Sequence, residues 1–120
     1  MKSILDSGTA LHKLIVATAL AFALNPAFAQ TVNEDAATAL AKAGNCFRCH
    51  SIDKAKKAPS YKRIAAKYKG RADAEAILMK HLSGSQTVKV EDGGDEEHEP
   101  PPAKSADEVK NLVRWILSRE

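Results

Sequence analysis

Two cysteines and a histidine stand close together in the stretch Cys46-Phe47-Arg48-Cys49-His50. Thiols separated by two residues can add across the two vinyl groups of a haem, and a histidine directly after the second thiol can bind the iron as an axial ligand. The chain contains no other cysteine. The spacing therefore predicts one covalently attached haem c, with its iron held on the proximal side by His50.

Three other uses of the cysteine pair fit the sequence less well. A structural zinc site needs further ligands of the same kind, and there is no second cysteine pair. A thioredoxin-like redox pair belongs in a βαβ pattern, which the surrounding sequence lacks. A plain disulfide between Cys46 and Cys49 leaves the adjacent His50 unexplained. We therefore favour covalent haem over zinc, redox and structural roles.

The first 29 residues have the layout of a secretory signal peptide. Two lysines make the start basic, an apolar run follows at 14–24, and Ala27 and Ala29 supply the small residues of a cleavage site. The apolar run is much shorter than the roughly 20 residues of a membrane span. We expect cleavage after Ala29, a mature haem-binding domain over residues 30–120, a location in the bacterial periplasm, and no stable membrane insertion.

The size and composition of the chain suit one small domain built around a prosthetic group. With 120 residues, one domain is the first expectation, and only 5% of the residues are aromatic. A small domain with a modest core commonly depends on a disulfide, metal or cofactor for stability. Composition therefore agrees with the cofactor that the cysteine motif predicts.

Positive and negative charges lie in different parts of the sequence. Residues 42–71 hold ten basic residues and one acidic residue, whereas residues 91–99 hold six acidic residues and no basic one. An acidic segment of this kind would repel nucleic acid, and no nucleic-acid-binding motif is present. We expect transient electrostatic docking to redox partner proteins, with plain solubility as the alternative. The basic candidates are Lys54, Lys56, Lys57, Lys62 and Lys67.

Apolar periodicity and capping residues predict an all-α domain with four helices. The first is expected over about 33–43 with Asn33 as its cap, and the next two over about 60–68 and 73–82. The last begins with a capping box at Ser105 and continues with apolar residues at helical spacing. The segment 85–104 is rich in glycine, proline and acidic residues without strand alternation. We expect it to be one long loop, either functional or disordered.

The chain resembles a small bacterial class I cytochrome c in three stretches, at residues 45–70, 74–86 and 105–118. They read NCFRCHSIDKAKKAPSYKRIAAKYKG, AEAILMKHLSGSQ and SADEVKNLVRWILS. The resemblance covers nearly all of residues 34–120 and fails only from 87 to 99. It implies a cytochrome c fold with helices wrapped around one haem, and N- and C-terminal helices that cross.

The resemblance also implies a role for Pro59, nine residues after His50. In the family the carbonyl oxygen of this proline accepts a hydrogen bond from the ligand histidine. Such a contact fixes the orientation of the ring and tunes the iron. A proline at this point also suits the start of a helix, and both roles can hold together.

The distal side departs from the family pattern. The family usually supplies a methionine ligand followed by prolines before the last helix, and here Glu99-Pro100-Pro101 falls in that place. A carboxylate is an uncommon partner for haem iron. Met79 is the only methionine beyond the predicted signal peptide, and we expect it to be a half-buried residue of the third helix. His81 in the same helix is expected at the surface.

His98 is the favoured replacement for the distal methionine, ahead of Met79, because it stands one residue from the expected place. Imidazole binds both oxidation states of iron strongly. Ligation by two histidines, with carboxylates nearby, would favour ferric iron and lower the reduction potential. The alternatives are a solvated His98 and an open or water-bound sixth position.

The resemblance implies an electron-transfer protein, not an enzyme, that carries single electrons through one haem. No acid–base or nucleophile arrangement is evident in the sequence. Two alternatives keep the haem but change its use. One is a protein that binds or senses a small ligand at an open or labile sixth position, and the other is a haem subunit of a larger oxidoreductase.

Overall fold

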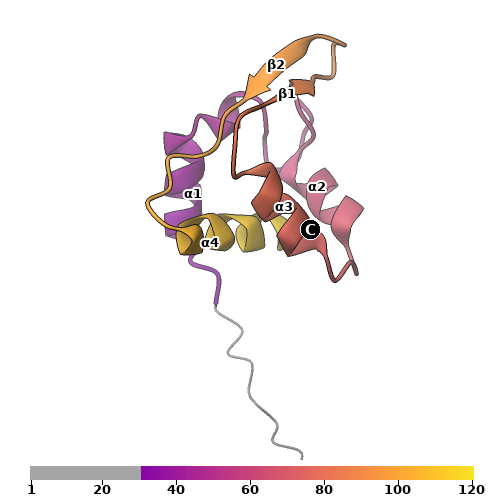
Figure 1. Ribbon diagram of the computed structural model, residues 1–120. Coiled ribbons are helices and arrows are strands. Elements are labelled where there is room, and N and C mark those ends of the chain that lie inside the picture. The colour runs from indigo at the N-terminus through magenta and orange to yellow at the C-terminus, as the bar shows by residue number, and fades with distance from the viewer. Residues whose placement is uncertain (1–30) are drawn as a thin grey trace, which may run out of the picture.

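The computed structural model describes residues 31–120 (Figure 1). The predicted signal peptide at 1–29 and the start of the mature domain at residue 30 lie outside the described residues and stay predictions. No helix in the described part of the chain combines the length and apolar character that crossing a membrane requires.

The four predicted helices are all present. They are α1 (Glu34–Ala43), α2 (Tyr61–Tyr68), α3 (Ala74–His81) and α4 (Ala106–Leu117). A short 3-10 turn, η1 (Cys46–Arg48), follows α1. Helix α4 forms the base of the domain, and α1, α2 and α3 each pack against it (Figure 1).

The helix ends follow from local hydrogen bonding. The Asn33 side chain accepts a bond from the backbone N–H of Ala36 at 3.0 Å, and Ser105 accepts one from Glu108 at 3.3 Å. The Glu108 carboxylate in turn accepts a bond from the backbone N–H of Lys104 at 2.7 Å. The contacts of Asn33 and Ser105 each satisfy a first-turn N–H that has no partner within its helix, and the contact of Glu108 fixes the chain just before α4. The predicted caps at Asn33 and Ser105 are confirmed.

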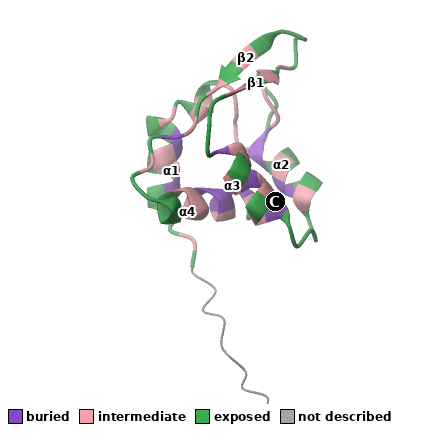
Figure 2. Cartoon of the chain, viewed as in Figure 1, coloured by how far each residue is buried: buried purple, intermediate pink, exposed green. Residues whose placement is uncertain are grey.

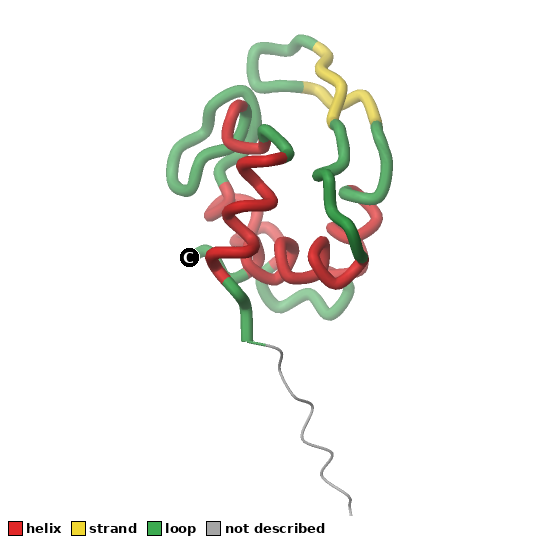
Figure 3. Tube along the Cα trace, turned by 90° about the vertical axis from the view of Figure 1, so that its left-hand side faces the viewer, coloured by secondary structure: helices red, strands yellow, loops and turns green. Residues whose placement is uncertain are grey.

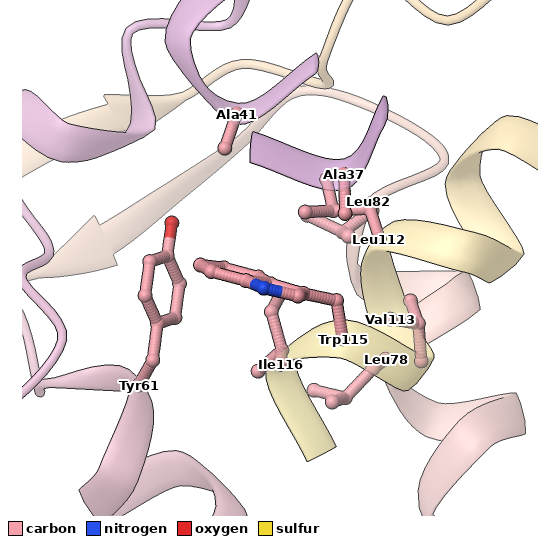
Figure 4. Close-up of a cluster of buried hydrophobic side chains, with 9 residues drawn as sticks. All are labelled: Ala37, Ala41, Tyr61, Leu78, Leu82, Leu112, Val113, Trp115 and Ile116. Carbon is pink, nitrogen blue, oxygen red and sulfur yellow. The ribbon is translucent and has the colours of Figure 1, made fainter. Parts of the chain in front are cut away.

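The core lies where α1 crosses α4. Leu112, Val113 and Trp115 on α4 are at most 1% exposed, and Ala37 and Ala41 on α1 are fully buried against the same cluster (Figure 4). Small alanine side chains let the two helix backbones approach closely, because interaxial distance depends on the side chains at the contact. The narrow alanine face of α1 therefore joins the N- and C-terminal helices.

The expectation of one irregular loop over 85–104 is wrong only for residues 86–98, which form a β-hairpin. Strands β1 (Gln86–Lys89) and β2 (Asp95–His98) pair antiparallel, with Gln86 opposite His98 and Lys89 opposite Asp95. Burial alternates along both strands, so one face is half-buried and the other exposed. The pattern is hard to recognise in the sequence because polar and charged residues occupy even the half-buried face.

A glycine turn closes this hairpin. Gly93 has a φ of 85°, which suits glycine, and the backbone N–H of Gly94 donates to the Asp92 carboxylate at 3.0 Å. The sequence Asp92-Gly93-Gly94 was therefore the available hairpin signal. The hairpin lies at the end of the domain opposite α4 (Figures 1 and 3) and is mostly exposed (Figure 2).

Candidate functional site

The two cysteines lie on the turn that follows α1. Asn45 adopts a left-handed conformation with a φ of 54°, and η1 begins at the next residue. The Cys46 carbonyl oxygen accepts bonds from the backbone N–H groups of Cys49 at 3.2 Å and His50 at 2.9 Å. This one turn therefore brings the three residues of the motif together.

Both cysteines are half-buried, and neither forms a disulfide within the described residues. Burial raises the pKa of the Cys46 thiol above its ordinary value, since the charged thiolate loses hydration. The pair is not joined in a disulfide, so both sulfur atoms are available for thioether bonds. This donor chemistry fits covalent haem.

The imidazole of His50 is oriented by Pro59. His50 Nδ1 lies 2.7 Å from the Pro59 carbonyl oxygen. A carbonyl oxygen can only accept, so Nδ1 carries the proton and Nε2 keeps its lone pair. Burial lowers the pKa of His50, which favours the neutral imidazole that a metal requires. The contact that the resemblance implied for Pro59 is thus present, and it leaves His50 ready to bind a metal through Nε2.

His98 lies at the end of β2 and faces the same region as His50. Their ring centres are 6.5 Å apart, with an interplanar angle of 76°. An imidazole nitrogen binds a first-row metal at about 2 Å, so two imidazoles on opposite sides of one iron have ring centres roughly 6 Å apart. The observed separation fits a shared iron.

One nitrogen of His98 also lacks a partner. Its Nδ1 is buried without a hydrogen bond in the described part of the chain. Buried polar groups in folded proteins are nearly always satisfied, because the loss of hydration is costly. The isolated nitrogen therefore fits a site that is completed by a further group.

His81 is not the surface residue that we expected. It is half-buried at the end of α3, and its ring centre lies 4.5 Å from that of His98. The expectation was based only on the place of His81 within its helix. The hairpin folds back onto the end of α3 and covers His81. Two histidines, and not one, therefore lie on the side of the site that faces His50.

A glutamine distinguishes the two distal histidines. Gln86 Nε2 donates to the His81 carbonyl oxygen at 2.7 Å, which fixes the orientation of the amide group. The same nitrogen lies 3.0 Å from His81 Nδ1, which must then accept and carry no proton. The His81 proton accordingly sits on Nε2, so that nitrogen has no lone pair for a metal. His98 is therefore the better ligand candidate.

The two other distal candidates lie in less suitable places. Met79 is half-buried and packs against the core cluster, as expected for a residue of α3. Glu99 is exposed, and its carboxylate accepts a hydrogen bond from the Ser85 hydroxyl at 2.7 Å. Within residues 31–120, no group of three or more carboxylate, histidine or cysteine side chains could hold a bare metal ion.

The basic and acidic segments partly pair with each other. Lys57 Nζ lies 2.5 Å from a Glu96 carboxylate oxygen, and Arg63 Nη1 lies 3.3 Å from one of Glu91. The Glu91 backbone N–H also donates to the Lys57 carbonyl oxygen at 2.9 Å. Sequence reasoning considered docking and solubility for these charges and missed their mutual contact, which spans 28 or more residues.

Comparisons with known proteins agree on one family. Residues 34–120 match the family model described as Cytochrome c. Cytochrome c-551 of Pseudomonas aeruginosa is 40% identical over 82 residues, which are 68% of this chain and 74% of that protein. Cytochrome c2 of Rhodocyclus tenuis is 38% identical over 82 residues, covering 68% of this chain and 89% of that protein.

Solved structures give the same result. The class 1 cytochrome MtoD from Sideroxydans lithotrophicus ES-1 matches with a TM-score of 0.68 and 51% identity, covering 72% of this chain and 96% of that chain. Cytochrome c552 of Nitrosomonas europaea matches with a TM-score of 0.55 and 31% identity, covering 69% of this chain and 99% of that chain. The helical arrangement and the sequence therefore point to the same relatives.

Proposed function

The chain belongs to the cytochrome c family, and from that premise we propose that it carries single electrons in the bacterial periplasm with its iron ligated by His50 and His98. It is a small c-type cytochrome with a class I cytochrome c fold, as predicted, and an electron-transfer protein, not an enzyme. The haem supplies one-electron exchange with redox partner proteins.

The main support for this proposal is the distance between the His50 and His98 rings. Their 6.5 Å centre-to-centre distance suits two axial ligands of one iron, and the bond to Pro59 leaves His50 with a free lone pair. Cys46 and Cys49 would form the thioether bonds. His98 would bind opposite His50, while Gln86 keeps His81 protonated on Nε2.

The proposed ligand pair implies a low reduction potential for this family. A histidine favours ferric iron relative to a methionine in the same place. Carboxylates on the strand that carries His98, at Glu96 and Glu97, add negative charge near the iron and act in the same direction. The effect of Glu96 is partly offset by its ion pair with Lys57.

The periplasmic location rests on the predicted signal peptide at residues 1–29. Docking to a redox partner would use the basic side chains that form no ion pair with the hairpin. Lys54 and Lys67 are exposed and form no ion pair within the described residues, whereas Lys57 contacts Glu96. Such exposed positive groups can steer an acidic redox partner at low ionic strength.

A change of ligand tests the proposed role. His98→Met should raise the reduction potential of the holoprotein, because a thioether stabilises ferrous iron better than an imidazole does. His81→Met is the matched control and should leave the potential close to that of the wild type. Potentiometric titration measures the reduction potentials of the wild type and of the two variants. Equal potentials in wild type and His98→Met would rule out His98 as the ligand.

A further inference from the structure

The hairpin that carries His98 also contacts the loop that follows His50, on the proximal side of the proposed haem site. The proximal loop, residues 51–59, leads from His50 to Pro59, and Lys57 lies within it. Lys57 contacts the hairpin twice, through its ammonium group to Glu96 at 2.5 Å and through its carbonyl oxygen to the Glu91 backbone at 2.9 Å. The hairpin thus spans from the end of α3 to the loop beneath His50.

A second ion pair reinforces this attachment. Arg63, in the first turn of α2, contacts the Glu91 carboxylate at 3.3 Å. Glu91 precedes the glycine turn, and Glu96 follows it on β2, two residues before His98. The two contacts therefore hold both arms of the hairpin on either side of its turn.

The hairpin needs external support to hold a ligand in place. It is a two-stranded ribbon with four residues in each strand, and an isolated ribbon of this kind is marginally stable in water. Its strands bury alternate residues only partly, so apolar packing contributes little. The position of His98 must then depend on contacts at the two ends of the hairpin.

We propose that Lys57 and Arg63 are positioning residues that clamp the hairpin and so hold His98 at iron-binding distance. The inference rests on the proposed function, because it takes His98 as the distal ligand. Both ion pairs are substantially exposed, with side-chain exposures of 44% and 36% in one and 66% and 44% in the other. Salt screens such pairs, so ionic strength should loosen the distal ligand.

The test measures how fast His98 leaves the iron. Saturating carbon monoxide is mixed with the ferrous holoprotein, and the limiting rate of the spectral change reports dissociation of the internal ligand. Carbon monoxide is neutral, so a changed surface charge does not alter its approach. Lys57→Met and Arg63→Met should each raise this rate about two- to fivefold, in line with exposed ion pairs of up to about 1 kcal/mol. The double variant should exceed both.

Lys54→Met is the matched control. It removes the same charge from the same loop, but the ammonium group of Lys54 forms no ion pair within the described residues. Its limiting rate should equal that of the wild type. Lys57→Arg keeps the charge and should stay within about twofold of the wild type. A thermal unfolding scan of each variant checks that the fold is kept.

A charge swap and a salt series make the test specific. Lys57→Glu and Glu96→Lys should each accelerate dissociation, and the two together should restore a rate close to that of the wild type. Raising the salt from about 0.01 M to about 0.5 M should accelerate the wild type and have less effect on the Lys57→Met/Arg63→Met variant.

The outcomes separate this inference from the function on which it rests. If Lys57→Met and Arg63→Met match Lys54→Met at every salt concentration, the clamp is refuted, while His50/His98 ligation stands. If His98→Ala has the same limiting rate and spectrum as the wild type, both proposals are refuted. A faster rate in both clamp variants with recovery in the charge swap supports the clamp.

Discussion

Gly44 shows how a single residue shapes the haem site. A Cβ atom at this position would lie 3.2 Å from the Pro101 Cα and 3.3 Å from the Cys46 sulfur. Its φ of −84° is open to any residue, so the requirement is for space and not for glycine's freedom. The end of α1 therefore lies close against the proline segment that follows His98, and a methyl group at Gly44 would require its neighbours to shift by a few tenths of an ångström.

Gly44→Ala should destabilise the holoprotein by about 1–3 kcal/mol, because an added methyl group in this tight contact displaces Pro101 or the Cys46 side chain. Chemical denaturation followed by circular dichroism measures the free energy of unfolding. Gly84→Ala is the control, since its Cβ would meet open space, and a change within about 0.5 kcal/mol is expected there. Equal effects in the two variants would contradict the tight contact at Pro101.

The residues of the motif could be predicted from sequence because their chemistry is local. Cys46, Cys49 and His50 are neighbours in the chain, and one turn brings them together. The place of His81 could not be predicted in this way. Its contact with His98 exists only because the hairpin folds back on α3, and no pattern within α3 signals that contact.

At the scale of elements, α3 and α4 are joined by a polar contact beside the core. Arg114 Nε donates to the Glu75 carboxylate at 2.8 Å, and Lys110 lies 3.5 Å from the same side chain. The hydrogen bond from Arg114 lowers the pKa of Glu75 below its ordinary value of 4.5. A carboxyl group with a lowered folded-state pKa stabilises the fold above the unfolded value, and this contribution is lost as the pH falls.

Glu75→Gln should therefore lower the free energy of unfolding at neutral pH by a few tenths to about 1 kcal/mol, the range for partly exposed pairs. The difference from wild type should shrink as the pH falls below the ordinary glutamate value of 4.5. Chemical denaturation of both proteins at a series of acidic pH values measures this difference in the free energy of unfolding. Glu120→Gln, at a carboxylate 82% exposed and 3.6 Å from Lys69, should change little at any pH. A Glu75→Gln difference that grows in acid would contradict the assigned pair.

The helices could be predicted from the sequence, whereas only the glycine turn of the hairpin could be recognised there and its two strands could not. Ser105 and the apolar spacing of α4 act within a few residues, so the sequence alone indicates that helix. The half-buried face of the hairpin carries Gln86, Val88 and Glu96, which do not look like a strand core. Its pairing is stabilised instead by the glycine turn and by contacts with distant segments.

At the scale of the whole molecule, the domain has a well-packed end around α4 and a poorly packed end at the hairpin. Helix α4 and its neighbours bury the core, whereas the hairpin at the opposite end is largely exposed (Figures 2 and 4). His50 is linked to the core because its ring stacks on buried Tyr61, with ring centres 5.2 Å apart, and Tyr61 in turn contacts Trp115 on α4. His98 lies on the hairpin. The proposed axial ligands therefore come from parts of very different local stability.

The basic and acidic segments of the sequence also form contacts with each other, in addition to any contact with solvent or a partner. The basic region near His50 and the acidic hairpin that carries His98 contact each other through two exposed ion pairs, Lys57–Glu96 and Arg63–Glu91. The same contacts leave fewer basic groups for docking than the sequence suggests. Intramolecular pairing is thus a third use of the charges, beside solubility and partner recognition.

Electron paramagnetic resonance of the ferric holoprotein tests the central claim most directly. Ligation by His50 and His98 predicts a low-spin signal in the wild type. This signal should persist in His81→Ala and give way to a high-spin signal in His98→Ala, because a strong-field imidazole ligand is lost. A high-spin wild type, or a low-spin signal unchanged in His98→Ala, would contradict the account.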